Sequence, residues 1–327
     1  MNKKAAKYPD PAKHCLGMLN FTPEKSGGYM KHIVPCMILL LALLAACSSG
    51  KDGLDLSAYK YNDTRNLVRF VRTAAQKLQQ RGLEGLAEFR REDSSENDYY
   101  LYVYDLEGVN IFHAGMPELE NRDLREIRDK DGKRLLDLVF EAVANPENPH
   151  GWVHYTWWEP GKFYPVPKSS CHFQVRLPDG RDAIIGGGIN YPLEEREFAR
   201  IAVDSAVNLI QAKGDSALAL IADDESSYNF REVKVFAFKA DGTILISPVL
   251  SDSLYQARLL DCADETGHKP FERALDQMRD QDRAWQIFLA KNRYERNLVK
   301  KTLYLRRTRL GADTIYVGAV TDLPQTP

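Results

Sequence analysis

Tyrosines occupy one side of a short predicted strand at residues 99–105. The sequence there alternates between tyrosine and aliphatic residues, and a β-strand turns successive side chains to opposite faces. The aliphatic face suits packing against a helix, whereas the tyrosine face is a candidate wall of a binding pocket. The tyrosines are Tyr100, Tyr102 and Tyr104.

A second aromatic group lies at residues 152–158, where three of the four tryptophans of the chain fall within seven residues. Trp152, Tyr155 and Trp157 carry polar groups on large apolar rings, so they could enclose a small ligand and orient it. The alternative is a heavy aromatic core that binds nothing.

Polar residues follow this aromatic group on a predicted strand at 169–177. A polar row on a strand is usually the solvated face of a sheet. Lys168 stands at the start of the strand, beside the aromatic hairpin, where its ammonium could present a charge and three donors to a carboxylate, or could be a solvated surface group. His113, after a predicted strand at 109–112, is either a further donor or a structural histidine. The residues predicted to bind a ligand are Tyr102, Tyr104, His113, Trp152, Tyr155, Trp157, Lys168 and Ser170.

The elements that must position these residues occur twice in the chain. Five landmark pairs lie 131 to 135 residues apart, among them Gly82 with Gly214 and Trp152 with Trp285. Each copy begins with a long amphipathic helix, continues with two strands joined at an Asp/Gly turn, and then has one or two helices and three further strands. In the first copy these are a helical segment over 64–91, in which Gly82 follows the main helix and a short apolar helix lies beyond it, a helix over 133–144 and strands at 151–158, 169–177 and 182–191.

Short connections between consecutive strands favour an antiparallel sheet, with the helices on one face. The sequence therefore predicts an α+β fold of two tandem domains, roughly 61–195 and 196–325, each a long N-terminal helix packed on an antiparallel sheet. The second copy has lost much of the polar aromatic pattern, although Lys301 corresponds to Lys168. We expect the second domain to be mainly structural and the first to bind the ligand.

The first copy resembles the single Cache domain family, a PAS-like extracytoplasmic sensor module. The segments that carry the resemblance are YVYDLEGVNIFHAG, RDKDGKRLLDLVFEAV, GWVHYTWWEP, PKSSCHFQV and IIGGGINY, in the order of the family. The resemblance implies tandem PAS-like Cache domains and a small organic acid or similar metabolite as ligand, with Lys168 where the family carries a ligand-contacting lysine or arginine. It also implies a membrane-spanning receptor or sensor kinase as partner, because the usual transmembrane helices and output are not recognised in this sequence.

A lipoprotein signal is predicted at residues 30–47. A basic start is followed by an apolar run of about ten residues, too short to cross a hydrocarbon core about 30 Å thick. The run ends in Leu-Ala-Ala-Cys, which looks like a lipobox with Cys47 as the lipidated residue. Ser48 follows Cys47, a pattern that in Gram-negative bacteria favours the outer membrane over the inner one, with the protein facing the periplasm. Residues 48–60 are then a tether.

Residues 1–29 precede this signal and are polar and lysine-bearing. We interpret them as a mis-annotated extension, with translation starting at Met30; an extension removed with the signal is the alternative. Of the five cysteines, Cys171 and Cys262 remain in the mature chain away from the anchor. They fall in different predicted domains, so we expect two buried free thiols.

Several function classes are disfavoured by the sequence. The 44 basic and 46 acidic residues nearly balance, which gives no reason to expect a nucleic-acid partner. The sequence has no GxSxG, HExxH or P-loop motif and no Cys/His cluster with metal spacing, so no enzyme activity, cofactor or metal is expected. The favoured function is a membrane-anchored sensor of a small carboxylate-bearing metabolite. The alternative is a structural or envelope-assembly lipoprotein that kept the fold without ligand binding.

Overall fold

The computed structural model describes residues 55–90, 99–144, 150–158, 163–248, 258–291 and 297–323. These ranges belong to one compact unit, Leu54–Pro327. The predicted signal, Cys47 and most of the tether therefore lie outside the described residues. Among the helices that are described, none is long and apolar enough to span a bilayer.

The first long helix, α2 (Asn62–Arg81), has a single apolar face. Its buried side chains recur at helical spacing, from Leu67 and Val71 to Leu78. The helix ends at Gly82, whose φ of 63° lies in the left-handed region that glycine adopts readily, and whose amide donates to the Leu78 carbonyl. A 3-10 helix, η2 (Gly82–Phe89), follows at once. The predicted helix over 64–91 is thus a main helix and a shorter one, divided at the glycine.

Five strands form the first sheet, in the order β2-β1-β5-β4-β3, and every neighbouring pair is antiparallel. The predicted strands are all present, although β4 begins before residue 169. The bounds are β1 (Tyr100–Asp105), β2 (Asn110–His113), β3 (Gly151–Trp158), β4 (Pro165–Arg176) and β5 (Asp182–Asn190).

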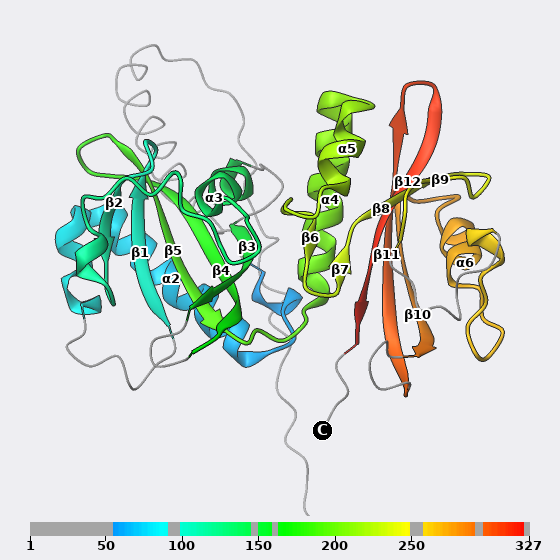
Figure 1. Ribbon diagram of the computed structural model, residues 1–327, viewed down its shortest axis with the longest axis horizontal. Coiled ribbons are helices and arrows are strands. Elements are labelled where there is room, and N and C mark those ends of the chain that lie inside the picture. The colour runs from blue at the N-terminus through cyan, green and yellow to red at the C-terminus, as the bar shows by residue number, and fades with distance from the viewer. Residues whose placement is uncertain are drawn as a thin grey trace, which may run out of the picture. The chain divides into compact units, whose positions relative to one another are not determined.

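Helices cover both faces of this sheet, so the prediction of helices on one face is wrong. On one face, Leu101, Cys171 and Phe173 pack in the core that contains the apolar side of α2. On the other face, Val153 and Ile184 pack against α3 (Leu135–Ala144). Figure 1 shows α2 and α3 on opposite sides of the strands. Because side chains alternate along each strand, the row that would have faced solvent is covered by α3 and the segment that leads to it.

The second half of the unit repeats the same plan. Its sheet order, β9-β8-β12-β11-β10, matches the first sheet strand by strand, and its long helix α4 packs on β11 and β12 (Figure 1). A small hairpin, β6 with β7, was not predicted. The elements are α4 (Arg196–Lys213), α5 (Ser216–Ala222), β6 (Asn229–Phe230), β7 (Val233–Lys234), β8 (Phe236–Lys239), β9 (Ile244–Ile246), α6 (Pro270–Gln277), β10 (Arg283–Lys291), β11 (Leu298–Leu310) and β12 (Asp313–Asp322), with short 3-10 helices at Leu56–Ala58, Pro117–Leu119 and Leu259–Asp261.

The α+β class with antiparallel sheets and a leading long helix is therefore confirmed. The division into domains at 61–195 and 196–325 stays a prediction, because residues 54–327 form one compact unit. Cys171 and Cys262 are both buried free thiols, as expected from the sequence.

Candidate functional site

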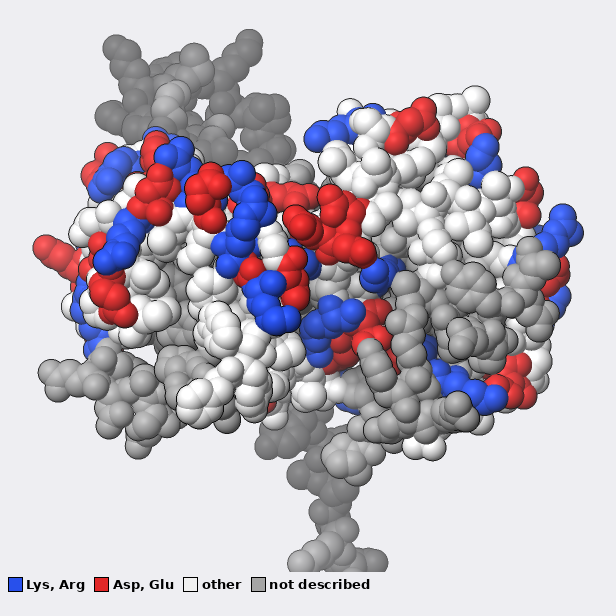
Figure 2. Space-filling model, viewed as in Figure 1, with Lys and Arg blue, Asp and Glu red and all other residues white. Residues whose placement is uncertain are grey.

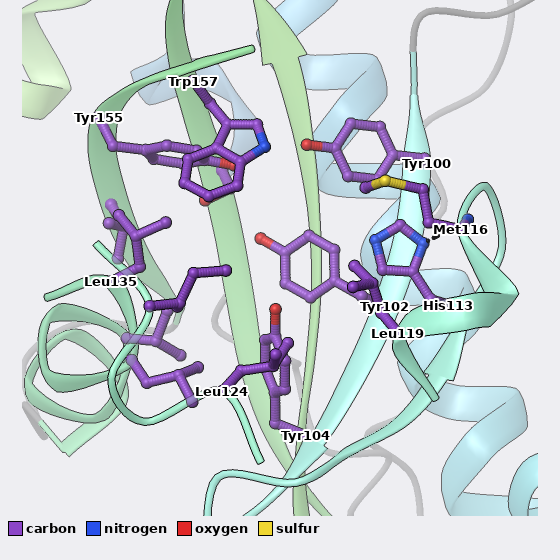
Figure 3. Close-up of a pocket in the computed structure, with 15 residues that line it drawn as sticks. Tyr100, Tyr102, Tyr104, His113, Met116, Leu119, Leu124, Leu135, Tyr155 and Trp157 are labelled. Atoms are coloured by element: carbon purple, nitrogen blue, oxygen red, sulfur yellow. Dashed lines mark hydrogen bonds between the residues drawn. The ribbon is translucent and has the colours of Figure 1, made fainter. Parts of the chain in front are cut away.

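A small cavity of about 60 Å³ lies on the face of the first sheet that α3 covers. We call it the tyrosine cavity. Figure 3 shows phenol rings of β1 projecting into it, with Tyr155 and Trp157 of β3 on the far side. Its lining residues are Tyr100, Tyr102, Tyr104, His113, Met116, Leu119, Leu124, Ile127, Leu135, Leu136, Val139, Val153, Tyr155, Trp157 and Ser170.

Strand alternation places the polar side chains in this cavity. On β4, Ser170 and His172 share the face of the tyrosines, while Cys171 and Phe173 point to the α2 core. On β5, Gly186 lies in register with both Tyr102 and His172. A Cβ at Gly186 would stand 2.4 Å from the His172 ring and 2.6 Å from the Tyr102 ring. The glycine therefore makes room for the two rings.

Hydroxyl groups meet at the floor of the cavity. The Tyr102 hydroxyl is 2.9 Å from Nε2 of His172. Burial raises the pKa of Tyr155, and the polar groups of Tyr100, Ser170 and Tyr102 nearby only partly oppose that rise. The phenols are thus neutral donors. The Ser170 Oγ is fully buried and has no protein partner of good hydrogen-bond geometry, although it lies near the phenols. A buried hydroxyl in this state is available to a ligand.

His113 is held as a neutral imidazole. Its Nδ1 accepts hydrogen bonds from the backbone amides of Gly115, at 3.2 Å, and Met116, at 2.9 Å. With Nδ1 accepting, the proton is assigned to Nε2, which makes that nitrogen a donor. Burial lowers the pKa of His113 to about 4, and the charge of Lys168 contributes in the same direction against two nearby glutamates. The ring stacks on Tyr100, with centroids 5.7 Å apart.

This assignment predicts that stability falls as the pH is lowered from about 6.5 to about 4. Unfolded imidazole titrates near 6.5, so within this window the unfolded state binds the extra proton. The contribution of His113 to the free energy of unfolding is therefore complete above pH 6.5 and is lost as the pH falls toward 4. Each unit of pKa difference corresponds to about 1.4 kcal/mol, so we expect His113→Asn to remove roughly 3 kcal/mol of pH dependence in urea unfolding.

The pKa of His150 is also lowered to about 4, so this residue adds to the pH dependence of stability in both proteins. The difference between wild type and the variant therefore reports the part that is due to His113. Asparagine retains an acceptor near the position of Nδ1. A folded-state proton titration of His113 with a midpoint at pH 6 or above would contradict the assignment.

Lys168 lies beside the tyrosine cavity and not in its lining. The side chain is only 3% exposed, and its ammonium is 5.3 Å from the centroid of the Tyr100 ring, which does line the cavity. On the sheet, Lys168 is directly opposite Tyr155 of β3 and Asn190 of β5. The lysine therefore places a buried positive charge behind the aromatic wall.

Of the eight predicted site residues, six line the tyrosine cavity and Lys168 borders it. Trp152 does not. It is one residue out of phase with Val153 and Tyr155, so it points to the opposite face, where its Nε1 donates to the Tyr59 hydroxyl at 2.8 Å. The six lining residues are Tyr102, Tyr104, His113, Tyr155, Trp157 and Ser170.

Sequence reasoning missed part of this site. Tyr100 was recognised on the tyrosine face but was not chosen, and the alternation was signal enough to choose it. Gly186 and Asn190 were not identified; a strand-by-strand comparison of the two copies could have found both. The apolar cover formed by Met116, Leu119 and Leu124 follows from the tertiary structure and left no recognisable pattern in the sequence.

The second sheet has apolar side chains where the first has its polar ones. By register, Tyr102 corresponds to Phe236, Tyr155 to Phe288 and Ser170 to Leu303. These replacements are buried in one hydrophobic cluster. The position of Lys168 is taken by Lys301, which pairs with Asp322. The equivalent region of the second sheet is thus packed by its own side chains.

Other site chemistry receives no support from the described residues. They contain no group of three or more histidine, cysteine or acidic side chains that could hold a metal. Figure 2 shows basic and acidic side chains interspersed over the face in view, which does not suggest an electrostatic surface for nucleic acid.

A model of the Cache domain family matches residues 72–309. Among curated proteins, methyl-accepting chemotaxis protein McpP of Pseudomonas putida is 32% identical over 166 residues, which cover 47% of this chain. The chain spans only 29% of the length of that relative.

Solved structures with similarity include a periplasmic sensor domain of a chemotaxis protein, 25% identical with a TM-score of 0.30, covering 50% of this chain and 99% of the other. A structure reported for carboxylic acid recognition by a Cache chemosensory domain is 29% identical with a TM-score of 0.33, covering 39% and 93%. A methyl-accepting chemotaxis protein from Vibrio parahaemolyticus is 20% identical with a TM-score of 0.32, covering 39% and 87%.

Proposed function

This chain belongs to the Cache domain family of extracytoplasmic sensors, and from that premise we propose that it binds a small carboxylate-bearing metabolite in the tyrosine cavity. The curated relative is a chemotaxis receptor, which supports a role in sensing. We propose that the protein acts by binding and passes occupancy to a membrane-spanning partner, a receptor or a sensor kinase, without catalysing a reaction.

The observation that carries the proposal is a buried positive charge beside a cavity with uncommitted polar groups. Lys168 is buried next to Tyr100, the Ser170 hydroxyl has no protein partner of good geometry, and the Nε2 hydrogen assigned to His113 adds a donor. A carboxylate can accept several hydrogen bonds at once, and those from charged donors are the strongest. Direct contact between the ligand and the ammonium would require the Tyr100 ring to move aside, because that ring lines the cavity and its centroid lies 5.3 Å from the ammonium.

The size of the cavity suits a ligand with a short chain. The cavity volume of about 60 Å³ is several times the 10–15 Å³ that one water needs on the same measure. A cavity of this volume has room for roughly four to six heavy atoms. Acetate and propionate fall in this range, and citrate does not. The aliphatic and aromatic walls would cover the short alkyl part.

The anchor completes the proposed arrangement. We propose that Cys47 carries lipid, that residues 48–60 are the tether, and that the Cache region faces the periplasm, with the outer membrane favoured by Ser48 if the organism is Gram-negative. The structural alternative, an envelope protein that kept the fold without binding, is favoured only for the second half, where apolar side chains fill the equivalent positions.

The test is calorimetric titration of the protein from Ser48 onward with propionate, and with propionamide as a neutral ligand of the same shape. We expect propionate alone to bind. Lys168→Ala should weaken propionate binding by roughly ten- to a hundredfold, since a charge-assisted hydrogen bond contributes about 1.5–3 kcal/mol and each tenfold corresponds to about 1.4 kcal/mol.

Lys301→Ala is the matched control and should leave the affinity unchanged, because its partner is Asp322. Equal affinity of wild type and Lys168→Ala would mean that the lysine has no part in binding. A larger loss from Lys301→Ala would place the ligand in the second half.

A further inference from the structure

Large apolar and aromatic side chains gather at one end of the first sheet. Both β3 and β5 are antiparallel to β4, so the ends of β3 and β5 and the start of β4 lie at the same end of the sheet. Among the described residues, six large side chains of this kind are at least half exposed, and five of them lie at or just beyond this end. We call these five the aromatic end: Trp158, Phe163, Tyr164, Tyr191 and Leu193, of which Phe163 is 99% exposed.

The equivalent end of the second sheet does not repeat these aromatic residues. By register, Lys291 takes the place of Trp158, and it forms an ion pair with Glu265. By the matching backbone hydrogen bond after the last strand, Leu323 takes the place of Tyr191 and is only partly exposed. The fold therefore does not require exposed aromatic side chains here, and an exposed group of them is typical of a contact with something outside the chain.

The long helix α2 starts at the aromatic end. The Tyr99 hydroxyl donates to the carbonyl of Asp63, in the first turn of α2, at 3.1 Å. Tyr99 directly precedes β1, whose first residue is in register with Gly188 near the end of β5. At the other end of the helix, Gly82 lies beside Pro178, which follows β4. The helix therefore runs across the sheet, away from the aromatic end.

The predicted tether leads to the start of this helix. The backbone amides of Lys60 and Tyr61 donate to the buried Glu195 carboxylate at 2.7 and 2.9 Å, which fixes the residues just before α2 to the segment that follows β5. The chain from Cys47 to Asp55 can span at most about 26–29 Å, at about 3.3–3.6 Å per residue. A lipid on Cys47 would therefore keep Asp55 within this distance of the bilayer.

We propose that the aromatic end is a membrane-contact surface, with which the protein rests on the headgroup region of the bilayer that holds its anchor. Tryptophan and tyrosine favour the membrane–water interface because each joins a large apolar ring to a polar group. Lys60 is exposed just before α2, with its ammonium 5.5 Å from the Tyr61 ring, and a cation there is attracted to anionic lipids.

The contact orients the protein and is too small to hold it on the bilayer without the lipid. It fixes the opposite end of the first sheet, with the turn between β1 and β2, away from the membrane. The inference rests on the proposed anchor for the position of the bilayer, and its test supplies that anchor chemically.

The test uses protein that begins at Cys47, coupled through that thiol to a maleimide lipid in vesicles of brominated phosphatidylcholine and phosphatidylglycerol. Cys171 and Cys262 are buried and do not compete for the coupling. Bromine quenches a tryptophan that touches the bilayer, so we expect the fluorescence to fall relative to vesicles without bromine. Most of this quenching should disappear in Trp158→Phe. Trp285→Phe, in the second sheet, is the matched control and should leave the quenching unchanged.

Loss of apolar area at the aromatic end should release the contact. We expect Phe163→Ser with Tyr164→Ser to remove most of the quenching, because interfacial binding scales with the buried apolar area. Leu106→Ser changes a side chain that is 45% exposed at the opposite end of the sheet, and it should have no effect.

Equal quenching in wild type and Trp158→Phe, or no quenching in wild type, overturns the inference. Dimerisation of the wild type that is lost in the double serine variant, without quenching, would assign this end to a second copy of the chain instead. Because the coupling is chemical, these outcomes do not depend on whether the cell lipidates Cys47, which fatty-acid labelling decides separately.

Discussion

Replacement of Ser170 by leucine is expected to reduce propionate affinity by more than a hundredfold while the protein stays folded. The hydroxyl projects into a cavity of only about 60 Å³, so a leucine would occupy the space that the ligand needs. The same change removes a buried hydroxyl that has no protein partner of good hydrogen-bond geometry. A hundredfold loss of affinity corresponds to about 2.7 kcal/mol of binding free energy. Steric exclusion of the ligand by leucine is sufficient for a loss of this size, even if no other contact changes.

The second sheet explains why this variant should fold. Leucine is already present at the equivalent position, Leu303, which is fully buried in an apolar cluster. Loss of an unsatisfied buried hydroxyl recovers about 1–3 kcal/mol, and tight packing costs about 1–3 kcal/mol, so the unfolding free energy should change little. Urea unfolding and calorimetry of the same sample check both statements.

Leu303→Ser is the reciprocal control. It should destabilise the protein by about 2–5 kcal/mol, because it empties a packed core position, and it should leave propionate affinity unchanged. Retained binding in Ser170→Leu would show that the ligand does not use the tyrosine cavity.

Cys47→Ser is expected to abolish membrane attachment. The thioether of a lipobox cysteine is the only anchor that we propose, and serine cannot form it. Two or more acyl chains hold a protein stably on a bilayer, since each buried CH₂ contributes about 0.8 kcal/mol. Without them, the membrane-associated fraction of the protein should fall from almost all to almost none.

The measurement is incorporation of a fatty-acid analogue, together with fractionation of membranes and soluble material. Cys36→Ser, upstream of the predicted cleavage point, is the matched control and should leave both unchanged. Unchanged labelling of Cys47→Ser would refute the anchor.

The sequence by itself determined the elements and their repetition. Alternation along 99–105 separated Tyr102 from Leu101 correctly, because side chains on a strand must take opposite faces whatever surrounds them. Gly82 marked the end of the first long helix, because a left-handed φ strongly favours glycine. These features depend on residues close together in the chain, so local patterns were sufficient to predict them.

Only the tertiary structure decided which face of the first sheet lines a cavity. It also decided which residues lie next to the Lys168 ammonium. The polar row with Ser170 had the pattern of a solvated face, yet α3 and the segment before it cover that row. Trp152 was grouped with Tyr155 by proximity in sequence, but strand alternation sends the two to opposite faces. Asn190 and Lys168 lie opposite each other only through strand pairing, so the pattern along either strand alone does not bring them together.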